Sequence, residues 1–181
     1  MTDPRVVITG FGTTNPSGFS IDETWTAVRS RKPALRSAAN GDPRLFPRVG
    51  ENNFDGLPVR KRDINRMSRS DSLAVVAAAR AMLDSGWTSG ELGDSAGLFL
   101  GTTKDTAPYD EFLQLLEPIA RRGFPAGAAE MVETATRYLT PFMLLDCMPN
   151  LSLHYIAEMF KLRGDNCCFL HTGAAGSSAA I

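Results

Sequence analysis

The sequence is poor in the residue types that metal and disulfide sites need. Its 181 residues include three cysteines and two histidines. Cys167 and Cys168 are adjacent, Cys147 stands apart, and no pair of cysteines has the spacing of a zinc or thioredoxin motif. The pattern predicts no disulfide framework and no metal, and we expect no other cofactor. The adjacent cysteines fit an apolar strand, where a thiol packs as a small hydrophobic group.

An excess of charge and long apolar runs are also missing. The formal net charge is -1, and the most basic stretch, residues 60–69, is short and interrupted. Nucleic acids and anionic membranes attract clustered Lys and Arg, so neither is an expected partner. No apolar run approaches the ~20 residues that span a bilayer, and residues 1–5 lack the apolar core of a signal peptide. We therefore expect a cytoplasmic protein.

A nucleotide-binding loop is excluded at the first glycine pair, Gly10 and Gly12. A dinucleotide fingerprint needs a third glycine at position 15 and a helix that starts at once. Position 15 is Asn15, and Pro16 follows it. The Gly-Lys-Ser/Thr of a Walker loop is absent as well. The glycines therefore predict a structural turn.

Apolar runs and helical patterns alternate along the chain, and 43% of its residues are hydrophobic. The runs that predict buried strands are residues 5–9, 96–100 and 167–170. The segments with helical spacing or capping residues are 23–29, 71–85, 109–121, 128–138, 149–164 and 172–181. Residues 31–61 predict a long surface connection with one short strand. The alternation favours one α/β domain over residues 1–181, with a largely parallel sheet.

Five segments, taken in order, resemble the N-terminal portion of β-ketoacyl synthases, the condensing enzymes of fatty-acid and polyketide assembly. They are residues 5–18 with Trp25 in the next helix, 67–87, 97–102, 141–164 and 172–176. The resemblance implies an α/β, thiolase-like layered fold, of which this chain holds the N-terminal half only. It also implies a mostly parallel sheet flanked by helices.

The family's nucleophile is a cysteine at a sharp turn from a strand into a helix. The positive end of the helix favours the thiolate, which takes the acyl group. Aligning without a gap from Gly164 places Gly173 at the cysteine position, and a shift of one residue places Ala174 there. Neither side chain has a nucleophile. The resemblance therefore implies that this chain has no catalytic residue and is inactive alone.

Two other nucleophiles are conceivable in the same region. Cys167 or Cys168 would do the chemistry if the turn were misplaced, but both lie inside the apolar run, where a thiol is poorly ionised. His171 could pair with Ser177 or Ser178. A nucleophile and its base usually come from separate elements, and no nearby carboxylate would orient this imidazole. Both alternatives are therefore less favoured than a chain without a nucleophile.

The resemblance also implies a partner. The family's two histidines and its lysine belong downstream of the turn, so either a partner completes this fold or the chain is a fragment. Type II polyketide systems pair an active ketosynthase with a cysteine-less homologue, the chain-length factor. A chain of that kind forms a heterodimer with the active ketosynthase and meets acyl carrier protein through that partner. The candidates for tunnel or interface contacts are Phe142, Met143, Leu144 and Leu145.

Three alternatives stay open at this point. The four apolar residues 142–145 would otherwise fill the core of this chain itself. The chain would otherwise be a fragment or split half of a β-ketoacyl-ACP synthase acyltransferase. A cysteine removed on purpose, to trap a substrate complex, would leave the same sequence at the turn.

Overall fold

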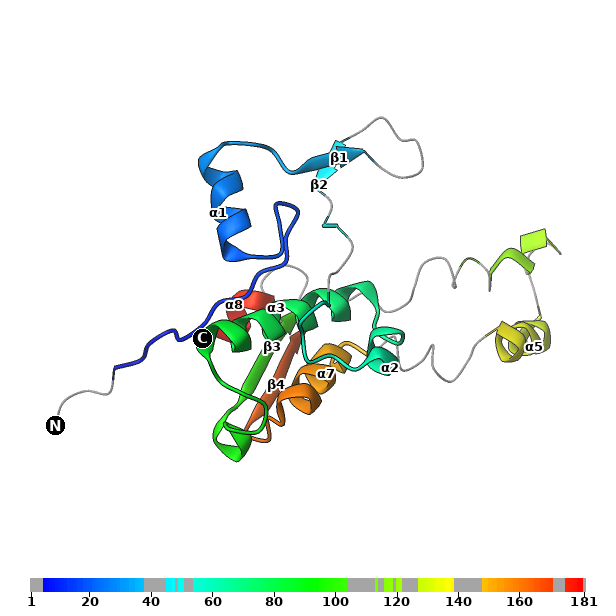
Figure 1. Ribbon diagram of the computed structural model, residues 1–181. Helices are drawn as coiled ribbons and strands as arrows, with labels where there is room; N and C mark the ends of the chain where they lie inside the picture. Colours follow the sequence, from blue (N-terminus) through cyan, green and yellow to red (C-terminus); the bar gives the residue numbers. More distant parts are fainter. Residues whose placement is uncertain are drawn as a thin grey trace. The chain divides into compact units, whose positions relative to one another are not determined.

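The computed structural model describes most of the chain. The described residues are 5–37, 45–47, 49–50, 54–103, 113, 116–118, 120–121, 127–138, 148–170 and 175–180. They form two compact units, one of residues Met1–Leu98 and His154–Asn166, the other of Phe99–Leu153 and Cys167–Ile181. Figure 1 labels their helices and strands.

The first helix of unit 1, α1 (Ile21–Arg29), begins two residues before the predicted segment 23–29. The side chain of Ser20 accepts a hydrogen bond from the Glu23 N–H at 3.1 Å, and the Glu23 carboxylate accepts one from the Ser20 N–H at 3.2 Å. This reciprocal capping box satisfies two backbone donors that the helix leaves open. The expectation of a capped helix here is confirmed.

The described part of the long connection after α1 contains two strands, whereas one was predicted. β1 (Leu35–Ser37) pairs antiparallel with β2 (Leu45–Pro47). The next element along the chain is a short helix, α2 (Lys61–Ile64). Because one two-stranded hairpin is marginal alone, its stability depends on the rest of the protein.

Helix α3 (Arg69–Ser85) has a second complete capping box, built from Ser68 and Asp71. It ends at Gly86, whose φ of 77° lies in the left-handed region that glycine adopts without strain. The helix begins two residues before the predicted segment 71–85 and ends where that segment ends. After α3 a turn of 3-10 helix, η1 (Gly93–Ser95), leads to the next strand.

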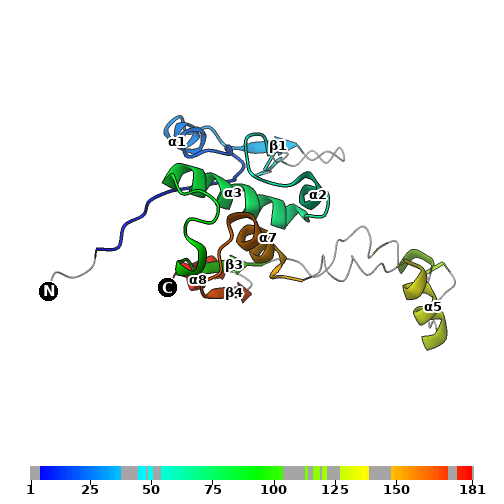
Figure 2. The same cartoon turned by 60° about the horizontal axis from the view of Figure 1, so that its bottom comes forward.

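The core of unit 1 lies between α3 and α7 (Leu151–Phe160), which run side by side in Figure 2. Ala79 of α3 lies in the same buried cluster as Ile156 and Phe160 of α7. Lys161, with a φ of 57°, ends α7. The buried apolar residues of the core cluster are Val75, Ala79, Ile156, Phe160 and Leu162.

The first predicted strand, residues 5–9, is not a strand, and that prediction is wrong. Val6, Val7 and Ile8 are 96%, 70% and 72% exposed. A strand is stable only beside another strand, and this segment belongs to neither of the two sheets in the described part of the chain. The apolar pattern of residues 5–9 is therefore not sufficient to predict a buried strand.

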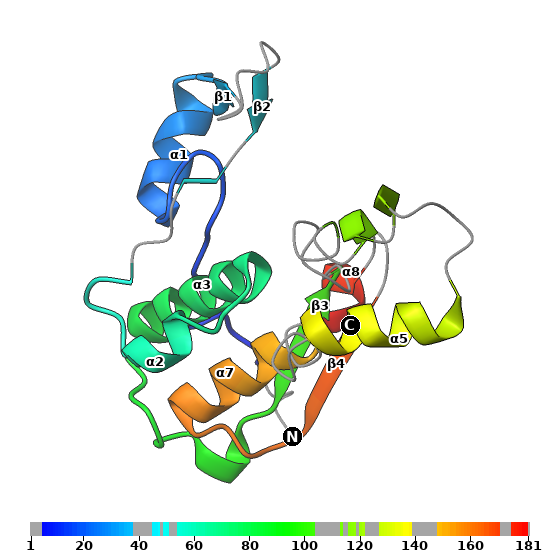
Figure 3. The same ribbon diagram turned by 90° about the vertical axis from the view of Figure 1, so that its right-hand side faces the viewer.

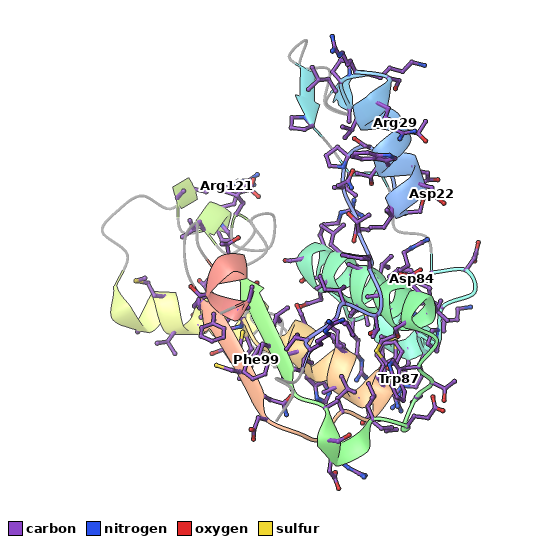
Figure 4. The ribbon with its side chains drawn as sticks, turned by 90° about the vertical axis from the view of Figure 1, so that its left-hand side faces the viewer. Asp22, Arg29, Asp84, Trp87, Phe99 and Arg121 are labelled. Atoms are coloured by element: carbon purple, nitrogen blue, oxygen red, sulfur yellow. The ribbon has the colours of Figure 1, made fainter. Side chains whose placement is uncertain are left out.

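The segment that follows is fixed on α3 by its glycines. A Cβ on Gly12 would lie 1.8 Å from the carbonyl oxygen of Ala77, so only glycine permits this approach. The Phe11 N–H donates to Oδ2 of Asp84, labelled in Figure 4, at 2.9 Å. The turn predicted at Gly10 and Gly12 is therefore a helix contact, consistent with a structural role.

The main sheet consists of β3 (Leu98–Thr102) and β4 (Asn166–Leu170). The Leu98 N–H donates to the Asp165 carbonyl at 2.8 Å, so the two strands start side by side and run parallel. This pair confirms the parallel arrangement. Burial is lower than predicted, since Phe99 is 54% exposed and Leu170 58% exposed. Phe99 projects from β3 in Figure 4.

The described residues of unit 2 also include helical segments. α5 (Ala128–Tyr138) has the predicted bounds, and α8 (Ala175–Ala180) lies inside the predicted segment 172–181. The described residues of segment 109–121, namely 113, 116–118 and 120–121, are helical. No helix within the described ranges is long and apolar enough to cross a membrane.

Candidate functional site

The candidate site is the segment of chain that connects β4 to α8. β4 ends at Leu170 and α8 begins at Ala175, so four residues connect the strand to the helix. Figure 3 shows α8 beside the ends of β3 and β4. The strand and the helix that a nucleophile turn requires are therefore both present in this region of the chain.

Several predicted site residues lie outside the described residues. They include both positions aligned with the cysteine, Gly173 and Ala174, together with His171. The four tunnel or interface candidates, Phe142, Met143, Leu144 and Leu145, lie outside them too. The geometry of the site therefore comes from the elements around these residues.

A close backbone contact fixes the start of α8. A Cβ on Gly101 would lie 2.1 Å from the carbonyl oxygen of Ala175, the first residue of the helix. Ala175 is 3% exposed. Glycine inside a strand marks such an approach, so its presence in an otherwise apolar run was the available signal. Sequence reasoning did not use that signal, and the contact between Gly101 and α8 was missed.

The two described cysteines lie in β4, before the turn. Both are free and half-buried. The Cys168 thiol donates to the Pro149 carbonyl, with Sγ 3.8 Å from the oxygen. Burial, and then the neighbouring Cys167, raises the pKa of the Cys168 thiol above its ordinary value. A reactive cysteine needs the opposite shift, so this environment disfavours Cys168 as a nucleophile.

Within the described ranges, no group of three or more His, Cys, Asp or Glu residues is arranged to hold a metal ion. The described part of the site consists of the start of α8 and its contact with β3.

Comparison with solved structures identifies the fold. A β-ketoacyl synthase from Burkholderia phymatum STM815 matches with a TM-score of 0.71 and 20% identity, over 97% of this chain and 41% of that one. The ishigamide ketosynthase/chain length factor matches with a TM-score of 0.66 and 19% identity, over 91% of this chain and 39% of that one. This chain has the fold of the N-terminal portion of a thiolase-like ketosynthase.

The sequence comparisons define the family. The model of the β-ketoacyl synthase N-terminal domain matches residues 3–181. The granaticin polyketide putative beta-ketoacyl synthase 1 of Streptomyces violaceoruber is 30% identical over 142 residues, which cover 76% of this chain and 34% of that protein. This chain belongs to the β-ketoacyl synthase family, and it spans about a third of the length of that relative.

Proposed function

We propose that this chain forms the N-terminal domain of a non-acylating, chain-length-factor-type subunit. The subunit pairs with an active β-ketoacyl synthase and shapes its acyl tunnel in type II polyketide or fatty-acid biosynthesis. The observation that carries the proposal is the residue type at the nucleophile position. Gly173 or Ala174 stands there, and neither side chain can attack a thioester.

The chemistry of acyl transfer supports a non-acylating role. A thiolate must attack the thioester carbonyl, form a new carbon–sulfur bond and expel the carrier thiolate. The start of α8 would supply the positive end that favours a thiolate, but the preceding residues supply no sulfur. Cys168, the nearest described thiol upstream, has a raised pKa and donates to Pro149.

The names of the relatives support a role in this biosynthesis. One relative is named as a polyketide ketosynthase, and one matching structure is named as a ketosynthase/chain length factor. The alternative is a fragment or split half of a β-ketoacyl-ACP synthase acyltransferase. Because the relatives are named as synthases, their names favour the acyltransferase fragment. The experiment therefore has to distinguish this fragment from a non-acylating subunit.

The direct test is acyl transfer measured by intact mass spectrometry. The chain is incubated with octanoyl acyl carrier protein, alone and together with a cysteine-bearing type II ketosynthase. We expect an octanoyl adduct on the ketosynthase and none on this chain. An octanoyl adduct mapped to Cys167 or Cys168 of this chain would contradict the proposal and establish an acyltransferase.

A gain-of-function pair tests the position of the turn. Gly173→Cys and Ala174→Cys each add one thiol before α8. We expect the variant whose thiol lies at the turn to become octanoylated, and the other to react no faster than Cys168. If neither variant is labelled faster than the wild-type chain, the assignment of residues 172–176 to the nucleophile turn is wrong.

A further inference from the structure

Helix α1 carries an apolar stripe that the chain leaves exposed. Ile21, Trp25 and Val28 are 47%, 56% and 59% exposed. They are spaced by four and then three positions, so they lie within about 60° of one another on a helix with 3.6 residues per turn. We call these three residues the α1 stripe.

The chain packs on a different side of α1. Thr24 and Ala27 are the half-buried residues of this helix, and none of its residues is fully buried. The Thr24 hydroxyl donates to the Ser20 carbonyl and accepts from the Asn15 side chain. The middle of this packed side lies about 100° around the helix from the middle of the α1 stripe. The α1 stripe is therefore not covered by these contacts.

The C-terminal end of the α1 stripe is basic. Arg29, Arg31 and Lys32 are all exposed there. The Arg29 guanidinium lies over the Trp25 ring, 5.3 Å from its centroid, and so stands at the edge of the α1 stripe. Asp22 lies seven positions before Arg29, on the same flank of the helix, and is exposed as well (Figure 4).

The N-terminal end of α1 borders an acidic hollow of about 670 Å³. Ile21, the first residue of the α1 stripe, lines it. Among the described residues of its wall, the charged ones are Asp22, Asp55, Asp84 and Arg80. Three carboxylates and one guanidinium leave a surplus of negative charge. One end of α1 is therefore basic, and the other end faces acidic groups.

We propose that the α1 stripe pairs with the α1 stripe of a second copy of this chain, with the two helices antiparallel. This pairing places Trp25 against Trp25 of the other copy and Ile21 against Val28, and twofold symmetry forms the second contact twice. The apolar surface of each copy then covers that of the other. The dimer goes beyond the proposed function, because it does not involve the ketosynthase.

Charge selects the antiparallel direction. In this arrangement Asp22 of each copy faces Arg29 of the other, because the two residues share one flank of the helix. Arg31 and Lys32 then lie toward the acidic hollow of the other copy. A parallel pair would instead bring the basic ends of both helices together, which like-charge repulsion disfavours.

The expected dimer is weak. Each α1 has nine residues, or about 14 Å of helix, so the pair buries less than the roughly 1,600 Å² of a standard interface. We expect a dissociation constant on the order of 0.1 mM, measured by sedimentation equilibrium of the chain up to about 1 mM.

Two charge reversals test the pairing. Asp22→Arg and Arg29→Asp each place like charges against one another in both symmetric contacts, so we expect each variant alone to dissociate about tenfold or more easily than the wild type. An equimolar mixture of the two variants places unlike charges together again, and we expect it to dimerise within about threefold of the wild type. Because mixing changes nothing inside either copy, this recovery is independent of folding. A mixture that associates no better than its components would overturn the proposal.

Two alanine variants test the apolar part. Trp25→Ala removes the centre of the α1 stripe, and the control, Thr26→Ala, changes an exposed residue about 100° away. Alanine favours the helix in both, and circular dichroism checks the helix content. We expect Trp25→Ala to raise the dissociation constant about tenfold or more and Thr26→Ala to leave it within about twofold.

Three outcomes would overturn the dimer. The first is a wild-type chain that stays monomeric up to about 1 mM. The second is a dimer that Trp25→Ala leaves intact. Both would leave the proposed function standing. The third is a monomeric chain whose binding to a cysteine-bearing type II ketosynthase is lost in Trp25→Ala, which would assign the α1 stripe to that partner instead.

Discussion

Replacing Gly101 by alanine adds one methyl group where β3 meets α8. The new Cβ would lie 2.1 Å from the carbonyl oxygen of Ala175, against about 3.4 Å for ordinary van der Waals contact, so the strand and the helix must separate by about 1.3 Å. Overpacking of this kind costs about 1–3 kcal/mol. Because Ala175 is the first residue of α8, the start of that helix loses its position on β3.

The matched control is Gly176→Ala, one residue further along α8. Nothing lies within 4 Å of a Cβ at Gly176, so the added methyl meets no neighbour. Alanine also favours the helix over glycine by up to about 1 kcal/mol. The same chemical change should therefore destabilise α8 at position 101 and stabilise it at position 176.

Hydrogen exchange of the α8 amides measures this difference locally. A loss of about 2 kcal/mol corresponds to roughly 30-fold faster exchange in Gly101→Ala, whereas Gly176→Ala should exchange more slowly than the wild type. Calorimetry should show a midpoint lower by about 2–4 °C for each kcal/mol lost, if α8 unfolds with the rest of the chain. Unchanged exchange in Gly101→Ala, or the same change in both variants, would refute the contact between β3 and α8.

Two further predictions concern the core and the thiols. Phe160→Ala, at a core residue that is 3% exposed, should cost about 3–5 kcal/mol in urea unfolding, while Phe99→Ala, at a residue 54% exposed, should cost under about 1 kcal/mol. Equal costs would show that Phe160 is not a core residue. The raised pKa of Cys168 keeps its thiol protonated at neutral pH, so its alkylation by iodoacetamide should begin at a higher pH than that of a free cysteine peptide. Faster alkylation of Cys168 than of the peptide at pH 7 would contradict the raised pKa of its thiol.

Local sequence predicted the helices well because their signals act over a few residues. Ser20, one of two expected caps, bonds the N–H of Glu23, and Gly86 ends α3 as expected with a φ that glycine adopts freely. The expected start of α3, Ser70 or Asp71, was two or three residues late, because the cap is Ser68. The bounds of α5 also followed from the spacing of its residues. A capping box needs no distant partner, so these predictions depend on nothing outside the segment itself.

The strands were predicted less well because pairing is not local. Residues 5–9 and 167–170 have similar apolar patterns, yet only the second run became a strand, β4. β4 has β3 as a neighbour, and the first run has no paired neighbour in the described part of the chain. The pattern of a segment gives its preference, whereas a strand also needs hydrogen bonds from another segment.

The sequence by itself determined the family, the capped helices and the absence of sulfur at Gly173 and Ala174, because each of these depends on residue identity and short spacing. Only the tertiary structure decided that Gly101 touches the start of α8 and that Cys168 donates to Pro149. Both contacts join residues far apart in the chain. Their geometry depends on how the segments pack, which no local pattern records.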